Sequence, residues 1–323
     1  MLKKILIVLL VLVAGLWLRN TSLFTAPASE GPPRFISHRG VHQTYHREDL
    51  ERDTCTAIRI YPPTHDFIEN TLPSMAAAFE AGAEIVEIDV HLTPDGEFAV
   101  FHDWTLDCRT EAEGVTHETP MSVLKTLDLG YGYTADGGET FPLRGKGAGM
   151  MPELTEVFDA FPEGKFLINF KSRRPVEGRV LAELLQENPA YLDQVWGIYG
   201  GEPPTLAAIE ALPQLQHYTR SGLMDCAKDY MLTGWTGIVP KSCHGSLVFV
   251  PVSHAHLVWG WPRAFEARMN KAGSTVVLVG SLSRNGIPGV DTPEEMAKVP
   301  EGFGGYVWTN RIETLGRAAP ETP

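Results

Sequence analysis

Two histidines stand where short apolar segments end. His38 follows residues 35–37 (FIS), and His102 follows residues 98–101 (FAVF). An imidazole gains or loses a proton near neutral pH, so two that lie close together can serve as general base and general acid. Arg39, next to His38, carries a planar guanidinium that can bind a phosphate through two N–H groups. These residues indicate acid–base chemistry beside an anionic group.

A pair of carboxylates is predicted on one face of a strand between these histidines. Residues 84–92 read EIVEIDVHL and alternate as a strand does. Glu87 and Asp89 therefore project from the same face. Two carboxylates that converge inside a protein are unfavourable unless a cation lies between them. A divalent ion, Mg²⁺ or Ca²⁺, would satisfy both, and structural pairing with Lys or Arg is the alternative.

Strands and helices are predicted to alternate along the body of the chain. The predicted strands cover residues 34–37, 84–92, 98–102, 165–171, 195–199, 216–219, 247–252, 275–279 and 306–309, and the predicted helices cover 71–82, 152–161, 179–186, 205–212 and 262–272. This alternation is typical of an α/β fold with a parallel sheet. Because the strand count is close to eight, we expect a (β/α)8 TIM barrel rather than an open sheet. Active sites of such barrels lie at the C-terminal ends of the strands.

Residues 1–29 are expected to be a signal peptide or an N-terminal membrane anchor with a tether. Lys3 and Lys4 precede fourteen uncharged residues, 5–18. That length suits the apolar region of a signal peptide and is short for a bilayer crossing, which takes about 17–25 residues. A cleaved signal and an uncleaved inner-membrane anchor both remain open, with a buried helix as a third interpretation. Residues 30–323 would form the folded domain, exported to the periplasmic or extracellular face.

The cysteines agree with export. No CxxC spacing occurs, so neither a structural zinc site nor a thioredoxin-like motif is indicated. We favour the disulfides Cys55–Cys108 and Cys226–Cys243, because the second pair closes a short loop and the first pair then follows. Such bridges suit an oxidising compartment. Four free thiols are the alternative.

The charge of the chain excludes one class of partner. Lys and Arg total 27 and Asp and Glu total 40, which gives a formal net charge of −13. A chain this acidic is poorly suited to bind nucleic acid through a broad basic surface. A local basic pocket for one phosphate remains compatible with it.

Short motifs occur in a fixed order between residues 35 and 110. They are His38-Arg39-Gly40, Glu69-Asn70-Thr71, Glu87-Ile88-Asp89, Thr93-Pro94-Asp95-Gly96, Val100-Phe101-His102-Asp103 and Leu106 with Arg109-Thr110. Each fragment alone has little specificity. The ordered set resembles the glycerophosphodiester phosphodiesterase (GDPD) family, and the resemblance continues more loosely to about residue 315.

The resemblance implies a fold, a reaction and a set of roles. The fold is a TIM barrel of the PLC-like phosphodiesterase type, and the reaction is metal-dependent hydrolysis of a glycerophosphodiester to glycerol 3-phosphate and an alcohol, a step of lipid metabolism. In the implied site His38 and His102 are the acid–base pair, Arg39 clamps the phosphate, Glu87 and Asp89 ligate the metal, and Glu69 lines the site near the metal or the glycerol.

Two strand ends depart from the family pattern. The family usually has an acidic residue two positions before a Lys in a central strand, where this chain has Asn169 before Lys171. An amide oxygen can still ligate Mg²⁺ or Ca²⁺, so Asn169 stays a candidate ligand, and Lys171 can reach a phosphate. The last strand ends in Asn310 where the family often has Asp. The lost charge predicts weaker metal binding or an altered ion preference.

Residues 41–68 form an insertion between the first two motifs. The segment holds three histidines and Cys55. A loop after the first barrel strand lies beside the active site, so this one is expected to be either a specificity lid or a surface loop tied down by Cys55. Farther along, His254 and His256 are predicted on one strand face in a structural or substrate-lining role.

Two other classes of function remain open. One is a phospholipase or sphingomyelinase D-like enzyme on the same barrel, in which Trp259 and Trp261 could line an apolar leaving group, although packing in the core is at least as well supported for them. The other is a non-catalytic barrel that binds phosphorylated ligands, which Asn169 and Asn310 motivate. Against it stands the presence of both histidines and both carboxylates.

Overall fold

Eight parallel strands form the centre of the molecule. The computed structural model describes residues 2–51, 54–282 and 288–316. The parallel strands are β1 (Arg34–His38), β2 (Ala83–Leu92), β4 (Phe166–Phe170), β5 (Val195–Gly200), β6 (Gln216–His217), β7 (Leu247–Pro251), β8 (Thr275–Val279) and β9 (Tyr306–Thr309). They are hydrogen-bonded in the order β6-β5-β4-β2-β1-β9-β8-β7. A parallel bridge between His217 and Ser246 joins the two ends of this order, so the sheet is a nearly closed barrel, as predicted.

One strand lies outside the ring. β3 (Phe98–Val100) runs antiparallel to β2, with Val90 opposite Val100. It ends two residues before the predicted boundary at residue 102. The N–H of Phe101 donates to the carbonyl of Asp89 (3.0 Å), which holds the following His102 close to the C-terminal half of β2.

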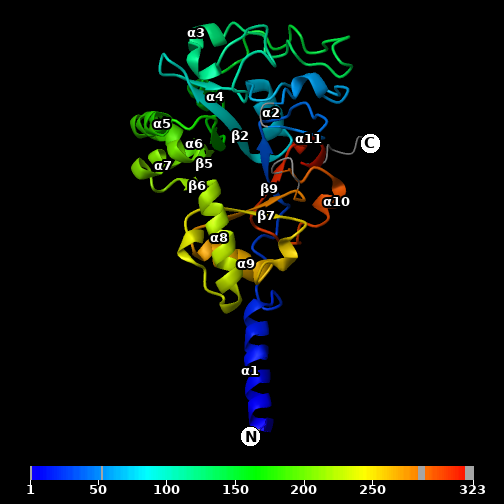
Figure 1. The fold of residues 1–323 in the computed structure, drawn as a ribbon, viewed down its shortest axis with the longest axis vertical. Helices are drawn as coiled ribbons and strands as arrows, with labels where there is room; N and C mark the ends of the chain where they lie inside the picture. Colours follow the sequence, from blue (N-terminus) through cyan, green and yellow to red (C-terminus); the bar gives the residue numbers. More distant parts are fainter. Residues whose placement is uncertain (1, 52–53, 283–287, 317–323) are drawn as a thin grey trace.

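Helices surround the barrel (Figure 1). They are α2 (Leu72–Glu80), α4 (Leu154–Ala160), α5 (Pro175–Glu187), α6 (Pro189–Gln194), α7 (Glu202–Ala211), α8 (Arg220–Thr233) and α9 (Arg263–Lys271), with the one-turn α3 (Met121–Leu124), α10 (Pro293–Met296) and α11 (Ile312–Leu315). α2 begins as predicted, because the Thr71 side chain accepts from the N–H of Ser74. The sequence pattern does not indicate α8, whose exposed Met224 and Met231 mask its amphipathic period.

Two apolar layers divide the faces of the strands. Inside the barrel lies one cluster, made of Ile36, Ile85, Leu167, Tyr199, Leu247, Phe249, Val277, Val279, Tyr306 and Trp308. Between the strands and the helices lies a larger cluster that includes Val86, Ile88 and Val90. The two faces of β2 therefore divide as predicted, and Glu87 and Asp89 continue the inward face beyond Ile85.

The insertion packs into a small layer of its own. Ile60 and Ile68 of the 41–68 segment are buried in a third apolar cluster with residues from 99–151, in the upper part of Figure 1. The disulfide Cys55–Cys108 joins these two segments. A second disulfide, Cys226–Cys243, joins α8 to the turn before β7. Both predicted pairings are confirmed.

The N-terminal segment is a helix that projects from the body. α1 (Leu2–Asn20) leaves the end of the molecule that lies lowest in Figure 1. Its apolar side chains from Ile5 to Leu18 are exposed, so the interpretation as a buried helix is wrong. Among the helices of the described residues, none has the length and apolar character needed to cross a membrane.

Of the expectations for residues 252–262, the one for the two histidines is wrong, and core packing is the alternative that holds for Trp261. β7 ends at Pro251, and the N–H of His254 donates back to the Pro251 carbonyl (2.9 Å), so His254 and His256 lie in a turn instead of on a strand face. Trp261 packs against Phe265 of α9 and against Phe303, which lies just before β9 begins. Phe303 therefore places Trp261 at the N-terminal ends of the strands, whereas His38 lies at their C-terminal ends. Core packing explains this tryptophan.

Candidate active site

Strand ends and the segment before α2 bring the predicted site residues together. His38 is the last residue of β1, and Glu87 and Asp89 lie on the inward face of β2. Asn169 of β4 is the register partner of Asp89, and Lys171 follows β4. The predicted active-site region is therefore built from three adjacent parallel strands and the segment after β3.

Asp89 is surrounded by cations and amides. Its carboxylate lies 3.1 Å from Nε of Arg39 and 3.3 Å from Nζ of Lys171. The side-chain amides of Asn70 and Asn169 donate to it at 3.0 and 2.8 Å. Burial alone would raise its pKa, but Lys171 and Arg39 outweigh burial and hold the pKa of Asp89 well below its usual value. Asp89 is therefore a carboxylate at neutral pH.

Glu87 has a different environment although it lies two residues away. Tyr199 on β5 donates its hydroxyl to Oε1 of Glu87 (2.5 Å). Oε2 is buried, lies 3.7 Å from Nε2 of His38, and has no hydrogen-bond partner among the described residues. Burial, and then the charge of Asp89, raise the pKa of Glu87 to about 8. A bound cation would favour its ionised form.

His38 is held by an amide. Its Nδ1 lies 2.6 Å from Oδ1 of Asn310. Asp291 fixes that amide, because Nδ2 and the backbone N–H of Asn310 both donate to its carboxylate at 2.7 Å. The amide oxygen is therefore turned to His38, so Nδ1 carries the proton and Nε2 carries a lone pair. Burial, and then Arg39, lower the pKa of His38 well below its usual value, so the ring is neutral.

His102 is held by a carboxylate. Its Nδ1 lies 2.6 Å from Oδ1 of Asp103, and Nε of Arg109 donates to the other oxygen of Asp103 at 2.8 Å. Arg109 is fully buried and also contacts Glu69 (3.3 Å), which accepts from Arg39 (3.0 Å). This chain of ion pairs ties the phosphate-binding candidate to the second histidine. Burial, and then Arg39, lower the pKa of His102.

The backbone around Arg39 is strained. Arg39 and Asn70 have φ values of 59° and 60°, in the left-handed region that side chains other than glycine rarely adopt. The carbonyl of Arg39 accepts from the N–H of Asn70 and from Oγ of Ser74, both at 3.0 Å. A Cβ on the next residue, Gly40, would collide with the backbone of Ser74. Such conformations cost on the order of 1 kcal/mol or more each and occur often where a side chain must be aimed.

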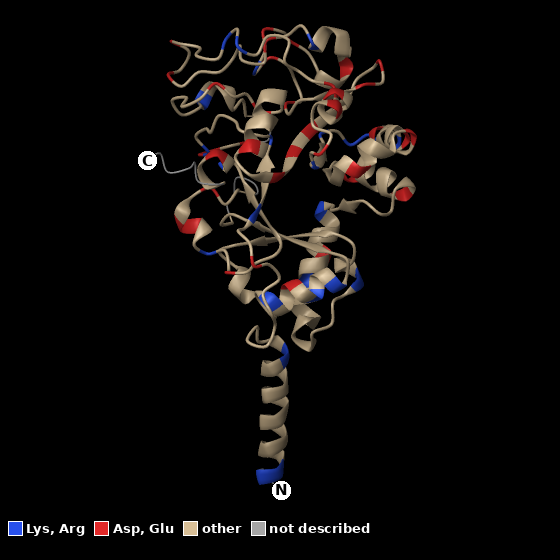
Figure 2. Cartoon of the chain, turned by 180° about the vertical axis from the view of Figure 1, so that it is seen from behind, with Lys and Arg blue, Asp and Glu red and all other residues tan. Residues whose placement is uncertain are grey.

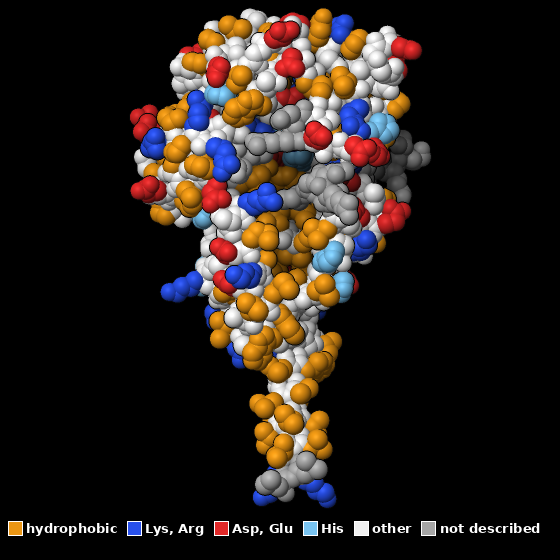
Figure 3. Space-filling view, in the orientation of Figure 1, with side chains coloured by type: hydrophobic (Ala, Val, Ile, Leu, Met, Phe, Trp, Pro, Cys, Tyr) orange, Lys and Arg blue, Asp and Glu red, His pale blue; other side chains and the backbone are white. Residues whose placement is uncertain are grey.

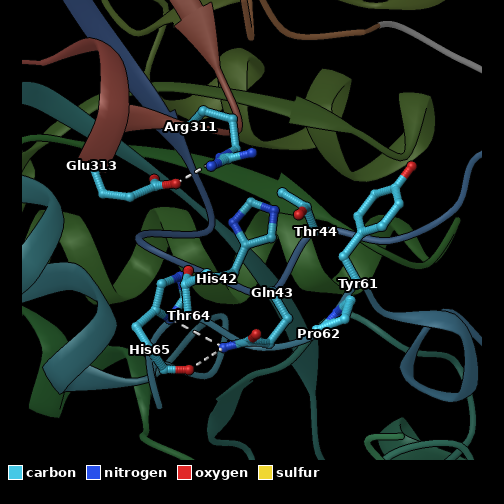
Figure 4. A pocket seen from close by; sticks show the side chains of 9 residues that line it. All are labelled: His42, Gln43, Thr44, Tyr61, Pro62, Thr64, His65, Arg311 and Glu313. Atoms are coloured by element: carbon cyan, nitrogen blue, oxygen red, sulfur yellow. Dashed lines mark hydrogen bonds and ion pairs between the residues drawn. The ribbon is translucent and has the colours of Figure 1, made fainter. Parts of the chain in front are cut away.

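Two hollows open beside these residues, and the insertion lines both. The larger, of about 640 Å³, has the Cys55–Cys108 disulfide as part of its wall, and its lining includes Thr54, His102, Trp104 and Lys171. The smaller, of about 160 Å³, lies between the start of the insertion and the segment after β9 (Figure 4). There Gln43 donates to the carbonyl of His65 and Arg311 pairs with Glu313 beside His42. The insertion therefore has buried contacts with the site and is not only a solvated loop.

Comparison with known proteins decides the family. A model described as the glycerophosphoryl diester phosphodiesterase family matches residues 38–220, which is more than half of the chain. The chain belongs to this family. The matched range contains all the predicted site residues, from His38 to Lys171, and ends at the first residue of α8.

Relatives and solved structures extend the comparison. A glycerophosphodiester phosphodiesterase of Caldanaerobacter subterraneus is 38% identical over 104 residues, which cover 32% of this chain and 39% of the relative. The lysophospholipase D GDPD1 of Mus musculus is 32% identical over 133 residues, 40% of each chain. The chain thus spans about two fifths of the length of these curated relatives. A glycerophosphodiester phosphodiesterase structure from Agrobacterium tumefaciens shares the fold, with a TM-score of 0.58 and 20% identity over 87% of this chain and 98% of that one.

The donor set fits a divalent ion on two of the three predicted ligands. Glu87 presents a buried oxygen without a hydrogen-bond partner, and Asp89 is ionised beside it. Asn169 turns its amide nitrogen, not its oxygen, toward Asp89. In the part of the chain that the structure describes, no group of three or more His, Cys, Asp or Glu is arranged to hold a metal. Asn169 as a third ligand therefore stays a prediction.

Sequence reasoning did not identify two positioning residues. Tyr199 fixes Glu87 from β5, and Asp291 fixes Asn310 from the segment before α10. The inward register of Tyr199 could have been read from the strand pattern. No local signal marks Asp291, because it meets Asn310 only where the connection before β9 folds back along that strand, with the N–H of Val290 donating to the carbonyl of Trp308.

Proposed function

We propose that this protein hydrolyses glycerophosphodiesters to glycerol 3-phosphate and an alcohol with the help of Mg²⁺ or Ca²⁺. The observation that carries the proposal is the convergence of two neutral imidazoles, two cations and a carboxylate pair at the C-terminal end of one barrel. Glu87 and Asp89 would hold the ion, with Asn169 as a further oxygen donor if its amide turns. When bound, the ion would neutralise a phosphate oxygen and acidify the attacking hydroxyl.

The residues of the chain divide the remaining work. Arg39 and Lys171 bind the non-bridging phosphate oxygens and stabilise the charge that develops there. His38, with its free Nε2, takes the proton of the attacking hydroxyl, which belongs to water or to the neighbouring glycerol 2-hydroxyl. In the second case the alcohol leaves from phosphorus as a cyclic glycerol phosphate forms, and a water molecule then opens this ring to glycerol 3-phosphate. His102 protonates the leaving alcohol, because Asp103 beside its Nδ1 partly offsets the burial and the Arg39 charge that lower its pKa, so the protonated ring is less disfavoured at His102 than at His38. Asn310 and Asp103 keep the two rings in place for these roles.

The substrate side of the proposal includes a second candidate. The 640 Å³ hollow with Trp104 on its rim has room for more than a small alcohol. One relative, the mouse protein, is named as a lysophospholipase D. A lysolipid-like or sphingomyelin-like diester is therefore the alternative substrate, and binding without turnover is the second alternative.

We also propose that the protein is exported. The observations that support this are the projecting apolar helix α1 and two disulfides, since disulfides persist mainly in oxidising compartments. The experiment for this part is mass determination of the mature chain from isolated envelope and medium fractions. Recovery of the chain with reduced cysteines from the cytosol would contradict export.

The test of the activity uses the full chain and three substrates in parallel. Glycerophosphocholine, glycerophosphoglycerol and lysophosphatidylcholine are incubated with Mg²⁺ and with Ca²⁺, and the products are identified. Glycerol 3-phosphate from the first two would support the proposal. Cleavage of the lysolipid alone would move the assignment to a lipid phosphodiesterase. Substrate binding by calorimetry without any turnover would indicate a non-catalytic barrel.

A further inference from the structure

The end of the body next to α1 carries a cluster of exposed apolar side chains. We call it the base patch, and it consists of Leu23, Phe24, Met231, Leu232, Trp235 and Ile238. Met231 lies in the last turn of α8, Trp235 lies in the turn that follows this helix, and Leu23 follows α1. Orange side chains cover this part of the surface in Figure 3. Contiguous exposed apolar surface on a soluble domain marks an interaction site.

The base patch is held in place by hydrogen bonds. Asn20 donates to the carbonyl of Trp235 (2.8 Å), and Arg268 donates to the carbonyls of Arg19 (2.6 Å) and Gly234 (3.2 Å). The indole N–H of Trp235 donates to the carbonyl of Leu232 (2.9 Å), so this ring needs no water for its polar edge. α1 and the end of α8 are therefore joined into one surface.

The charge around the base patch is opposite in sign to that of the chain. Residues 219–275 contain six Lys or Arg against three Asp or Glu, and residues 1–34 contain four against one, although the chain has a net charge of −13. Figure 2 shows this separation, with blue around α1, α8 and α9 and most red at the other end. Of the three acidic residues in 219–275, Glu266 is buried. A partner for this surface must be both apolar and anionic.

We propose that the base patch and its basic surround dock on an anionic lipid bilayer. Anionic lipid headgroups attract Lys and Arg within about a Debye length, and apolar side chains enter the boundary between headgroups and acyl chains. The exposed apolar side chains of α1 start from the same surface and extend it. A second protein would need to match a surface that combines a long apolar helix with scattered cations, whereas a bilayer matches it without shape complementarity.

The docking surface fixes the direction in which the active site faces. The N–H of Ala28 donates to the carbonyl of Gly302, and the N–H of Gly304 donates to Glu266 of α9, so this end of the body lies where β9 begins. The catalytic residues lie at the opposite ends of the strands. Docking therefore points the active site away from the bilayer and toward water-soluble diesters, a consequence that rests on the proposed function.

Two equally exposed tryptophans allow a direct test. Trp235 in the base patch is 42% exposed, and Trp104 beside the active site is 43% exposed. The full chain carries Trp17→Phe and Trp259→Phe, which remove the indole of α1 and an exposed indole that donates to the carbonyl of Met231. It is mixed with vesicles of phosphatidylcholine and phosphatidylglycerol that contain brominated acyl chains. We expect strong fluorescence quenching that Trp235→Phe abolishes and Trp104→Phe leaves unchanged. Quenching that depends on Trp104, or no quenching at all, would overturn the proposal.

Charge variants test the electrostatic part. Lys228 lies on the exposed face of α8, and Lys146 is an exposed lysine of the 99–151 segment. Lys228→Gln should weaken binding to vesicles with phosphatidylglycerol by roughly fivefold, and Lys146→Gln should leave it unchanged. An equal loss of vesicle binding in the two variants would contradict docking on lipid. Sedimentation of the protein without lipid as a dimer or larger assembly, in which a second copy covers the base patch, would contradict it as well. Turnover of a soluble glycerophosphodiester without vesicles reports separately on the proposed activity.

Discussion

At the scale of single residues, the two histidines differ in the side chain that contacts the Nδ1 atom of each ring. His38 donates to the amide of Asn310, which leaves its other nitrogen as an acceptor, whereas His102 contacts the carboxylate of Asp103. An amide partner favours the neutral ring, and a carboxylate partner favours the protonated one. This difference is the reason why the proposed mechanism places the base at His38 and the acid at His102.

Removal of either imidazole tests that assignment. His38→Ala and His102→Ala should each lower kcat by roughly 10²–10⁴-fold, the usual contribution of a positioned acid or base. The measurement is the initial rate of glycerol 3-phosphate release at saturating substrate. His244→Ala, at an exposed histidine in the turn before β7, is the control and should keep nearly full activity. Near-complete activity in either site variant would contradict the mechanism.

The neutral Asn169 tests the metal site. Asn169→Asp replaces an amide in register with Asp89 by a carboxylate, which restores a third charge to the site. Because ligand charge strongly affects divalent-ion affinity, the metal concentration for half-maximal activity should fall by roughly tenfold. Asn270→Asp adds the same charge on the exposed surface of α9 and should leave the metal concentration for half-maximal activity unchanged. An unchanged metal requirement in Asn169→Asp would separate this position from the ion.

At the scale of elements, the strands could be predicted and the long connections could not. The alternation in residues 84–92 places Glu87 and Asp89 inside the barrel, because period two and burial agree there. The alternation around His254 is misleading, since a turn closes after Pro251 and no strand partner is available. The inward register of Tyr199 follows from the strand pattern, but its contact with Glu87 depends on the order of the strands in the sheet. Asp291 reaches the site because the connection between β8 and β9 folds back along β9. Local patterns contain no information about such contacts.

Removal of either disulfide should lower stability, and only removal of Cys55–Cys108 should also raise KM. Cys55–Cys108 lines the 640 Å³ hollow, whereas Cys226–Cys243 lies near α8. Loop-closure entropy predicts a loss of stability of about 4 kcal/mol without the first bridge and about 3 kcal/mol without the second. Cys55→Ser with Cys108→Ser should also raise KM, because it releases a wall of the hollow. Denaturant unfolding and kinetics at low temperature measure both effects, and an equal KM in the two double variants would contradict this division.

At the scale of the whole molecule, the two ends of the barrel have opposite character. The end near α1 is basic and apolar, and the catalytic end carries the insertion and most of the acidic side chains (Figure 2). The joint between α9 and the segment before β9 contains the buried Glu266, whose Oε1 accepts from Gly304 (2.8 Å) and whose Oε2 has no partner among the residues described. Protonation of Glu266 therefore makes the stability of this end of the molecule depend on pH.

Stability should fall as pH rises across the titration of Glu266. Burial raises its pKa from 4.5 to about 7, so the folded chain keeps a proton that the unfolded chain releases. The stability this proton provides is lost between about pH 4.5 and pH 7, on the order of 1–3 kcal/mol. Urea unfolding of the protein and of Glu266→Gln at pH 5 and pH 7.5 measures it, with exposed Glu294→Gln as control. A difference between protein and variant that does not change with pH would contradict this prediction.

The most direct test of the central claim is glycerol 3-phosphate release before and after metal removal. The full chain is treated with EDTA, assayed on glycerophosphodiesters, and assayed again after Mg²⁺ or Ca²⁺ is restored, alongside His38→Ala. We predict release that stops with EDTA, returns with the ion and remains very low in the variant. Release that persists in EDTA, or no release with either ion, would contradict metal-dependent hydrolysis at this site.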